Sequence, residues 1–148
     1  MRRSRYSLVL LLVAGLIPVL TCSAQHMNSA AAPCRTPMSG RDSSNCFHAA
    51  AQKADKELNV TYSQIRAVLK NRGGDDDLQN LVNAQRIWLQ FRDASCKAEH
   101  ALYEGGSAAP EVYDACLEET TRLRTADLET AYGWVVEKFG DQPQNGGK

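Results

Sequence analysis

The residues of this chain with the greatest capacity for chemistry are its five cysteines: Cys22, Cys34, Cys46, Cys96 and Cys116. Cys22 belongs to an N-terminal leader, and the other four are separated by 11, 49 and 19 residues. A structural zinc site usually has close pairs such as C-x-x-C, which these spacings do not provide. Four cysteines in a small domain outside the cytoplasm are typical of two disulfides. The sequence therefore predicts two disulfides and no metal site, with three pairings open.

The histidines and acidic residues do not form a catalytic pattern. His26, His48 and His100 share no regular spacing, and the G-x-S-x-G, P-loop, H-E-x-x-H and G-x-G-x-x-G motifs are absent from the sequence. Adjacent acids such as Glu118 and Glu119 are typical of a solvated helix face. We therefore predict that the chain is not an enzyme, has no catalytic residues and binds no cofactor.

The first 24 residues have the pattern of an export signal. Three arginines precede an apolar run over residues 8–20, which is too short to be a convincing membrane span. Cleavage after Ala24 would release the mature chain. In the alternative, residues 19–22 form a lipoprotein box and Cys22 carries a lipid, although Thr21 departs from the usual Gly, Ala or Ser. An uncleaved anchor is a third alternative. We expect a periplasmic or extracellular protein whose membrane contact depends on a lipid anchor at Cys22.

Composition and charge limit the class of protein. The chain has 148 residues, of which 43% are hydrophobic and 23% charged, as in a single globular domain. Its 17 basic residues balance its 17 acidic residues, which argues against a nucleic-acid partner. Removal of residues 1–24 takes away three arginines and no acid, so the mature chain has a net charge of −3. That charge slightly favours a basic partner.

Apolar residues recur at steps of three and four over residues 45–139, which predicts three amphipathic helices. The first helix would begin at the potential N-caps Ser43, Ser44 and Asn45, and end at residues 71–74. The second would run from residues 75–77 to the break at 104–110, and the third from Pro110 to Phe139. The apolar stripe predicted for the second helix comprises Leu78, Leu81, Ala84, Trp88, Phe91, Ala98 and Leu102.

These features predict an all-α fold, an antiparallel three-helix bundle stapled by two disulfides. Residues 25–44 would form an irregular arm, residues 45–139 the helical domain, and residues 140–148 a disordered tail. At about 1.5 Å per residue, Cys96 and Cys116 lie at nearly the same height on neighbouring helices. We therefore predict a Cys96–Cys116 bond, which leaves Cys34 to pair with Cys46 and fasten the arm to the first helix.

Three charged residues share the inward phase of the three helices: Asp55, Arg92 and Arg124. Asn59, Tyr62 and Gln85 are predicted to supply the remaining hydrogen bonds of this group. By the same count of heights, Asp55 and Arg92 are level, and Arg124 lies within about one turn of them. Buried charges need partners, so we predict a partly buried cluster in which Asp55 pairs with both arginines. We interpret this cluster as an internal clamp that fixes the register of the helices, the alternative being a ligand or catalytic pocket.

Three motifs carry a resemblance to a known family. They are Ala54-Asp55-x-x-Leu58-Asn59-x-x-Tyr62, Gln85-Arg86-x-Trp88-x-x-Phe91-Arg92-Asp93-x-x-Cys96 and, after Cys116, Thr121-x-x-Arg124-x-x-x-Leu128. With these motifs the chain resembles, over residues 34–132, the LprI-like N-terminal domain of lysozyme inhibitors, a family of small exported bacterial proteins. The resemblance implies a helical, disulfide-bonded, exported protein. The family takes its name from a lipoprotein that inhibits lysozyme, so lysozyme inhibition is the first functional hypothesis. The alternative is an envelope interaction or scaffold protein with another partner.

A lysozyme inhibitor would have to block a basic glycosidase that works with two carboxylates. A protruding loop that carries a cation suits that task. The first interhelical loop places Arg72 beside two glycines and next to Asp75, Asp76 and Asp77, so it is the candidate partner-binding loop. Residues 103–110 form the other exposed loop. The alternative for residues 72–77 is an ordinary helix–helix turn with capping acids.

Overall fold

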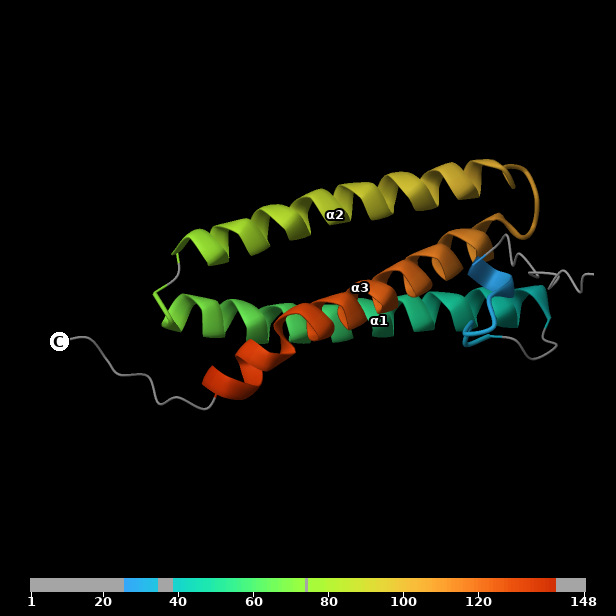
Figure 1. Ribbon diagram of the computed structural model, residues 1–148. Coiled ribbons are helices and arrows are strands. Elements are labelled where there is room, and N and C mark those ends of the chain that lie inside the picture. The colour runs from blue at the N-terminus through green and yellow to red at the C-terminus, as the bar shows by residue number, and fades with distance from the viewer. Residues whose placement is uncertain (1–25, 35–38, 74, 141–148) are drawn as a thin grey trace, which may run out of the picture.

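The structure, a computed structural model, describes residues 26–34, 39–73 and 75–140. It contains a short 3-10 helix, η1 (His26–Asn28), and three long helices, α1 (Gly40–Asn71), α2 (Asp75–Ala101) and α3 (Ala109–Phe139). Successive long helices run in opposite directions, and η1 lies near the start of α3 (Figure 1). The described ranges contain no strand. The prediction of an all-α fold with three long helices is confirmed.

Helix α1 begins earlier than the sequence predicted. Its N-cap is Ser39, whose hydroxyl oxygen accepts a hydrogen bond from the backbone N–H of Asp42 at 3.3 Å. The same hydroxyl donates to the carboxylate of Asp42 at 2.6 Å. This reciprocal pairing resembles a capping box and also places an acid in the first turn, where the helix dipole favours it. Helix α1 therefore starts at Gly40.

The predicted N-caps Ser43, Ser44 and Asn45 are wrong, because all three lie inside α1. Two of them have a different task. The hydroxyls of Ser43 and Ser44 donate to the carboxylate of Glu111 in α3, at 3.1 and 3.3 Å. The irregular arm expected over residues 25–44 is correspondingly shorter: within the described residues it spans η1 and the segment to Cys34, followed by Ser39.

The turn between α1 and α2 depends on a glycine. Gly73 has a φ of +71°, a left-handed conformation that residues with a side chain rarely adopt. The three aspartates after it, Asp75, Asp76 and Asp77, form the first turn of α2, where negative charge complements the helix dipole. Helix α3 has Pro110 in its first turn, as predicted.

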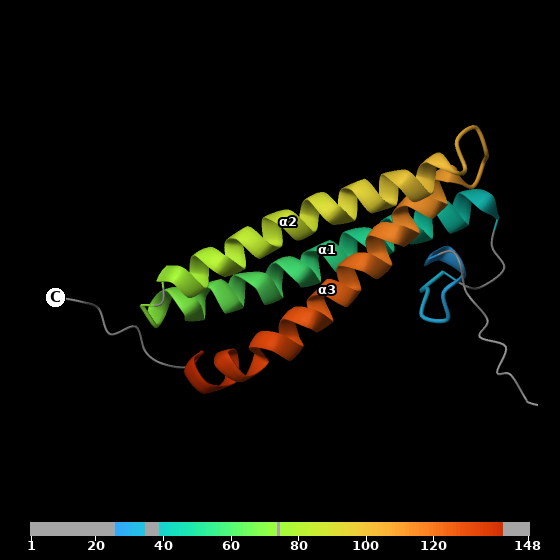
Figure 2. The same cartoon turned by 45° about the horizontal axis from the view of Figure 1, so that its top comes forward.

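The main apolar core lies between α1 and α3. Its buried members are Leu58, Ile65, Val68 and Leu69 of α1, Leu81 of α2, and Leu128 and Val135 of α3. Helix α1 packs far more extensively on α3 than on α2, and the two views of the ribbon show α2 at the edge of the assembly (Figures 1 and 2). Helix α2 buries only Leu81, Gln85 and Cys96.

The apolar stripe predicted for α2 is only partly correct. Leu81 is buried and Trp88 half-buried, but Ala84 and Ala98 are exposed, as is Phe91 with 61% of its surface. The cause is the rotation of α2 about its own axis. The bond from Cys96 to α3 turns the side that contains Gln85 and Arg92 inward, so residues about a third of a turn away face solvent.

Both predicted disulfides are confirmed. Cys96 and Cys116 join α2 to α3 with a Cα–Cα distance of 5.5 Å, and Cys34 and Cys46 join the arm to α1 with 6.0 Å. A second, smaller apolar cluster surrounds the latter bond, with Ala32, Phe47 and Ala115 buried around Cys34. Two structural disulfides are typical of proteins that function outside the reducing cytoplasm.

The expected leader over residues 1–24, with Cys22, and the expected tail beyond Gly140 lie outside the described residues. Of the helices that the structure describes, none combines the length and the apolarity that a membrane crossing requires.

The disulfides predict a measurable difference between two double variants. The closed loops have sequence separations of 12 and 20, so the loss of either bond should cost about 3 kcal/mol through the greater freedom of the unfolded chain. Replacement of Cys96 and Cys116 by alanine should cost more, because both side chains are buried and leave a cavity. Urea unfolding of both variants tests this, with helicity followed by circular dichroism. Equal losses would show that the buried volume has no effect.

Candidate functional site

The side chain of Arg92 links all three long helices. Its Nη1 donates to Asp55 of α1 at 3.0 Å and to the hydroxyl of Thr121 of α3 at 3.2 Å. Its Nε and Nη2 both lie 3.0 Å from a carboxylate oxygen of Asp93 on α2 itself. The Arg92 side chain is 13% exposed, whereas that of Asp55 is 53% exposed. The ion pair therefore lies at the rim of the helix interface, with its cation inside and its anion near water.

Arg124 has a different partner from the one predicted. Its Nε donates to the side-chain oxygen of Gln85 at 3.1 Å, and no ion pair joins it to Asp55 in the part of the chain that the structure describes. The indole of Trp88 is a shared neighbour of the two arginines. Both guanidinium groups lie over this ring, with Arg92 5.3 Å and Arg124 5.7 Å from its centre. Trp88 thus lies next to both cations. The amide oxygen of Gln85 accepts the hydrogen bond from Arg124 that was predicted for the carboxylate of Asp55.

Asn59 and Tyr62, predicted as hydrogen-bond partners in this cluster, do not have that role. Asn59 is exposed, and Tyr62 packs its ring against the apolar core with the guanidinium of Arg66 5.6 Å from the ring centre. Neither makes a hydrogen bond to Arg92 or Arg124 among the described residues. Thr121 and Trp88 also belong to the cluster and were not predicted as members, although both share the phase of the predicted residues. We call Asp55, Gln85, Trp88, Arg92, Thr121 and Arg124 the arginine cluster.

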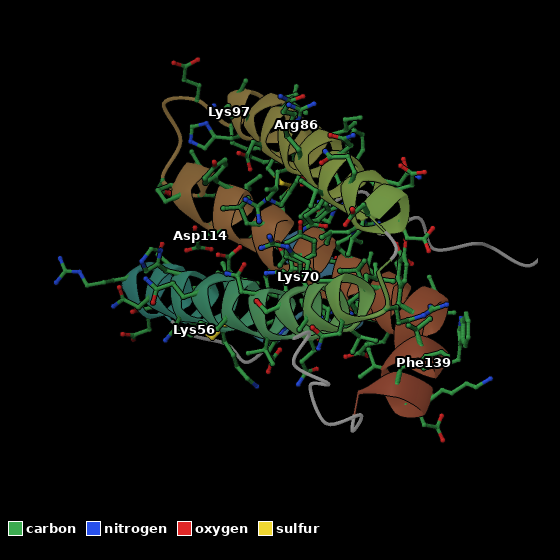
Figure 3. The ribbon with its side chains drawn as sticks, turned by 90° about the vertical axis from the view of Figure 1, so that its left-hand side faces the viewer. Lys56, Lys70, Arg86, Lys97, Asp114 and Phe139 are labelled. Atoms are coloured by element: carbon green, nitrogen blue, oxygen red, sulfur yellow. A yellow bond between two sulfur atoms is a disulfide. The ribbon has the colours of Figure 1, made fainter. Side chains whose placement is uncertain are left out.

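An open cleft of about 530 Å³ lies beside the arginine cluster, between α1 and α3. Asp114 and Lys56, which both line it, lie on the same side of the molecule (Figure 3). Nδ1 of His48 is 3.3 Å from a carboxylate oxygen of Asp114, and Asp55 pairs with Arg92. The anionic groups here are therefore matched by neighbours within the chain. This pairing supports the interpretation of the cluster as a clamp between helices.

A second group combines residue types that bind metals. One ligand atom each of His26, Glu99 and Cys116 lies within 4.8 Å of the others. The sulfur of Cys116 is bonded to Cys96, however, so it is not available as a thiolate. Nδ1 of His26 instead lies 2.6 Å from a carboxylate oxygen of Glu99. This contact ties the arm to α2, and the two remaining ligands are too few for a structural metal site.

The candidate partner-binding loop lies at the end of the molecule where α1 meets α2. The guanidinium of Arg72 is 4.5 Å from the ring centre of Phe139, in the last turn of α3. Asp75, Asp76 and Asp77 are all exposed beside it. The loop is thus joined to the end of α3, a contact between residues far apart in the sequence that helical periodicity does not predict. Phe139 marks this end of the molecule in Figure 3.

A shallow groove of about 350 Å³ completes this surface, lined by Arg72, Asp77, Tyr132 and Trp134 among others. The side chain of Trp134 is 58% exposed, an unusual state for so large an apolar group. The helical phase of Trp134, about 100° around α3 from the buried Val135, is the sequence signal that could have indicated its exposure. We call Arg72, Asp75, Asp76, Asp77, Trp134 and Phe139 the turn-end surface.

Comparisons with known proteins identify relatives over most of the chain. A family model described as "Lysozyme inhibitor LprI" matches residues 34–128. An uncharacterized protein of Rhizobium meliloti (strain 1021) is 35% identical over 121 residues, which cover 75% of this chain and 87% of the relative. No solved structure matches the chain significantly.

The arginine cluster predicts unequal effects for the two partners of its ion pair. Arg92→Ala should lower the free energy of unfolding by about 1–3 kcal/mol, because the buried hydroxyl of Thr121 loses its donor and Trp88 loses a packing partner. Asp55→Asn should cost less than about 1 kcal/mol, because its carboxylate is half exposed. Arg86→Ala, at an exposed arginine of α2, is the control in urea unfolding. Equal losses for Asp55 and Arg92 would contradict a clamp built on the cation.

Proposed function

The chain belongs to the LprI family of lysozyme inhibitors, and from this premise we propose that it is an exported binding protein that inhibits a lysozyme. The matched residues 34–128 include the four paired cysteines and the arginine cluster, so they account for the scaffold. The family is one of binding proteins and not of enzymes. Inhibition then requires a surface that can obstruct a substrate cleft.

The observation that carries this proposal is the position of Arg72. Its side chain is exposed at the tip of the molecule, and its guanidinium is stacked on Phe139. Stacking occupies the face of a guanidinium and leaves the N–H groups at its edge available. Such an edge fits a carboxylate through two parallel hydrogen bonds, and a lysozyme cleft contains two catalytic carboxylates. The stack also holds the cation in place before binding, which reduces the entropy lost on association.

The other members of the turn-end surface suit the rim of such a cleft. Asp75, Asp76 and Asp77 offer three exposed carboxylates to the basic surface of a lysozyme. Trp134 adds a large exposed aromatic group, the type of residue that most often dominates binding energy at protein interfaces. The net charge of −3 on residues 25–148 should further speed the encounter with a basic enzyme, and salt should weaken this effect.

The proposed function includes export, with residues 1–24 as the signal. A purified exported chain should begin at Gln25 when signal peptidase cleaves after Ala24. In the lipoprotein alternative it begins at Cys22 with an attached lipid, and Cys22→Ser should then release it from the membrane or leave it unprocessed. Mass spectrometry of the N-terminal peptide distinguishes the two cases. An intact Met1 on the exported protein would contradict both.

The turn-end surface predicts the behaviour of three variants in a lysozyme lysis assay. Arg72→Ala should raise the inhibition constant about tenfold or more, since it removes a charge-assisted contact. Replacement of Asp75, Asp76 and Asp77 by Asn should raise it mainly at low salt. Arg86→Ala, at an exposed arginine on α2, is the matched control and should have no effect. The Arg72 and Arg86 variants should keep the melting temperature of the parent within a few degrees. The aspartate variant should melt several degrees lower, because the first turn of α2 loses the charges that complement the helix dipole.

Two results would count against this scheme in different ways. If the parent protein fails to inhibit lysozymes of several types, the proposed function is wrong. If the parent inhibits and the Arg72 and aspartate variants inhibit equally well, the function stands but the turn-end surface is only a helix–helix turn.

A further inference from the structure

The ring of Phe139 lies next to a second cation besides Arg72. The guanidinium carbon of Arg72 is 4.5 Å from the ring centre, and Nζ of Lys138 is 5.4 Å from it. Arg72 follows the end of α1, whereas Lys138 belongs to the last turn of α3. An aromatic face attracts cations through its negative charge density. The ring therefore brings together two positive charges from distant parts of the sequence.

Neither cation has an anionic partner within the described residues. The ion pairs there use Lys53, Arg92, Arg122 and two histidines, and none includes Arg72 or Lys138. Two like charges beside one ring repel each other, so their proximity costs free energy until an anion neutralises it. Both side chains are exposed, so a partner's anionic group can reach them.

The charge of the whole chain has the opposite sign. Residues 25–148 carry a net charge of −3, which favours approach to a basic protein such as the proposed lysozyme. A cation at the tip of the molecule weakens this long-range attraction. It can strengthen the complex only at short range, against an anion that the basic enzyme itself contains. The catalytic cleft, with its two carboxylates, is such a place.

We propose that Arg72 and Lys138 bind the two catalytic carboxylates of the lysozyme, one carboxylate each, and that Phe139 is the positioning residue for both. We call Arg72 and Lys138 the cation pair. This inference rests on the proposed function and specifies its contact. Two atoms at 4.5 and 5.4 Å from one point are at most about 10 Å apart, and the paired carboxyl groups of glycosidases are roughly 5–9.5 Å apart. The cation pair can therefore reach both carboxylates at once.

The two members of the cation pair suit different tasks. The planar guanidinium of Arg72, stacked on Phe139, has a fixed direction and fits one carboxylate with two hydrogen bonds. Lys138 carries a point charge on a flexible stem, so it can follow a second carboxylate whose distance from the first differs between enzymes. A glycosidase with a single catalytic carboxylate would engage only half of the pair. The partner is therefore a lysozyme that uses two.

The test is the dissociation constant, Kd, of the complex between the exported chain with intact disulfides and a lysozyme. Lys138→Met should raise the Kd about tenfold, the loss expected for one charge-assisted contact. Lys70→Met is the matched control, because Lys70 is exposed in the last turn of α1 at the same end of the molecule (Figure 3). It makes the chain more acidic, so it should leave the Kd unchanged or lower it slightly.

The control also accounts for stability. Lys70 and Lys138 both lie in the last turn of a helix, where the helix dipole favours a cation. The two variants should therefore lose similar amounts of melting temperature. A change of Kd in opposite directions then reports the contact with the lysozyme and not the helix end.

A double-mutant cycle assigns each cation to its carboxylate. The Kd is measured again with two lysozyme variants, in each of which one catalytic carboxylic acid is replaced by its amide. Against one of them, Lys138→Met should change the Kd less than about twofold, because the group that Lys138 binds is already uncharged. Against the other, the change should stay about tenfold. Arg72→Ala should show the reverse pattern.

Two variants test the positioning role of Phe139. Phe139→Leu retains both cations and an apolar side chain but removes the aromatic face, so it should raise the Kd several-fold. Phe139→Tyr retains the ring and should bind like the parent. A role in apolar packing alone would give the leucine variant the affinity of the parent once circular dichroism shows equal helicity.

The outcomes separate this inference from the function on which it rests. If the parent binds no lysozyme, the proposed function is wrong and the cation pair is wrong with it. If the parent binds and Lys138→Met has the same Kd as Lys70→Met, the function stands and the cation pair is overturned. The absence of coupling to either carboxylate in the double-mutant cycle would have the same meaning.

Discussion

The disulfide between Cys96 and Cys116 is the constraint that shapes the rest of the molecule, because it sets the rotation of α2. Helix α1 and helix α3 share a long apolar interface, but α2 buries only three residues. A helix so poorly covered would be free to roll if apolar contact alone held it. The covalent bond at Cys96 and the apolar contact of Leu81 fix its two halves. Between them, the inward side of α2 carries Gln85, Trp88 and Arg92, so it is narrow and largely polar.

The arginine cluster supplies hydrogen-bond acceptors for the cations that this polar face places at the helix interface. A cation directed at a helix interface is costly unless its hydrogen bonds are satisfied. Arg92 meets this condition with acceptors on three helices, and Arg124 meets it with the amide of Gln85. Trp88 supplies the apolar surface over which both guanidinium groups lie. Such a set of directional contacts specifies the register of the helices better than side chains that can slide past one another.

The sequence predicted the helices and the disulfide pairing because both follow from counting along a regular helix. Heights at a fixed rise per residue were sufficient to pair Cys96 with Cys116. Three features were not predicted, because helical periodicity does not determine them. Ser39 caps α1 through a local contact with Asp42, in a segment rich in competing serines. The rotation of α2 was misjudged because that helix carries two apolar faces, and the pattern does not say which of them is covered. Arg124 lost its carboxylate partner to Gln85, next to the ring of Trp88, which a count of heights does not reveal.

The family match covers the candidate binding surface less completely than it covers the scaffold. The residues that the family model matches end at position 128, so they contain Arg72 but not Trp134 or Phe139. The stack of Arg72 on Phe139 therefore depends on the last turns of α3, which follow the matched residues. An arginine at this turn without an aromatic ring beneath it would keep its charge and lose its fixed orientation. Membership in the family consequently explains how the three helices are held together. The orientation of the Arg72 guanidinium, on which the choice of partner would depend in the proposed function, is set by its contact with the end of α3.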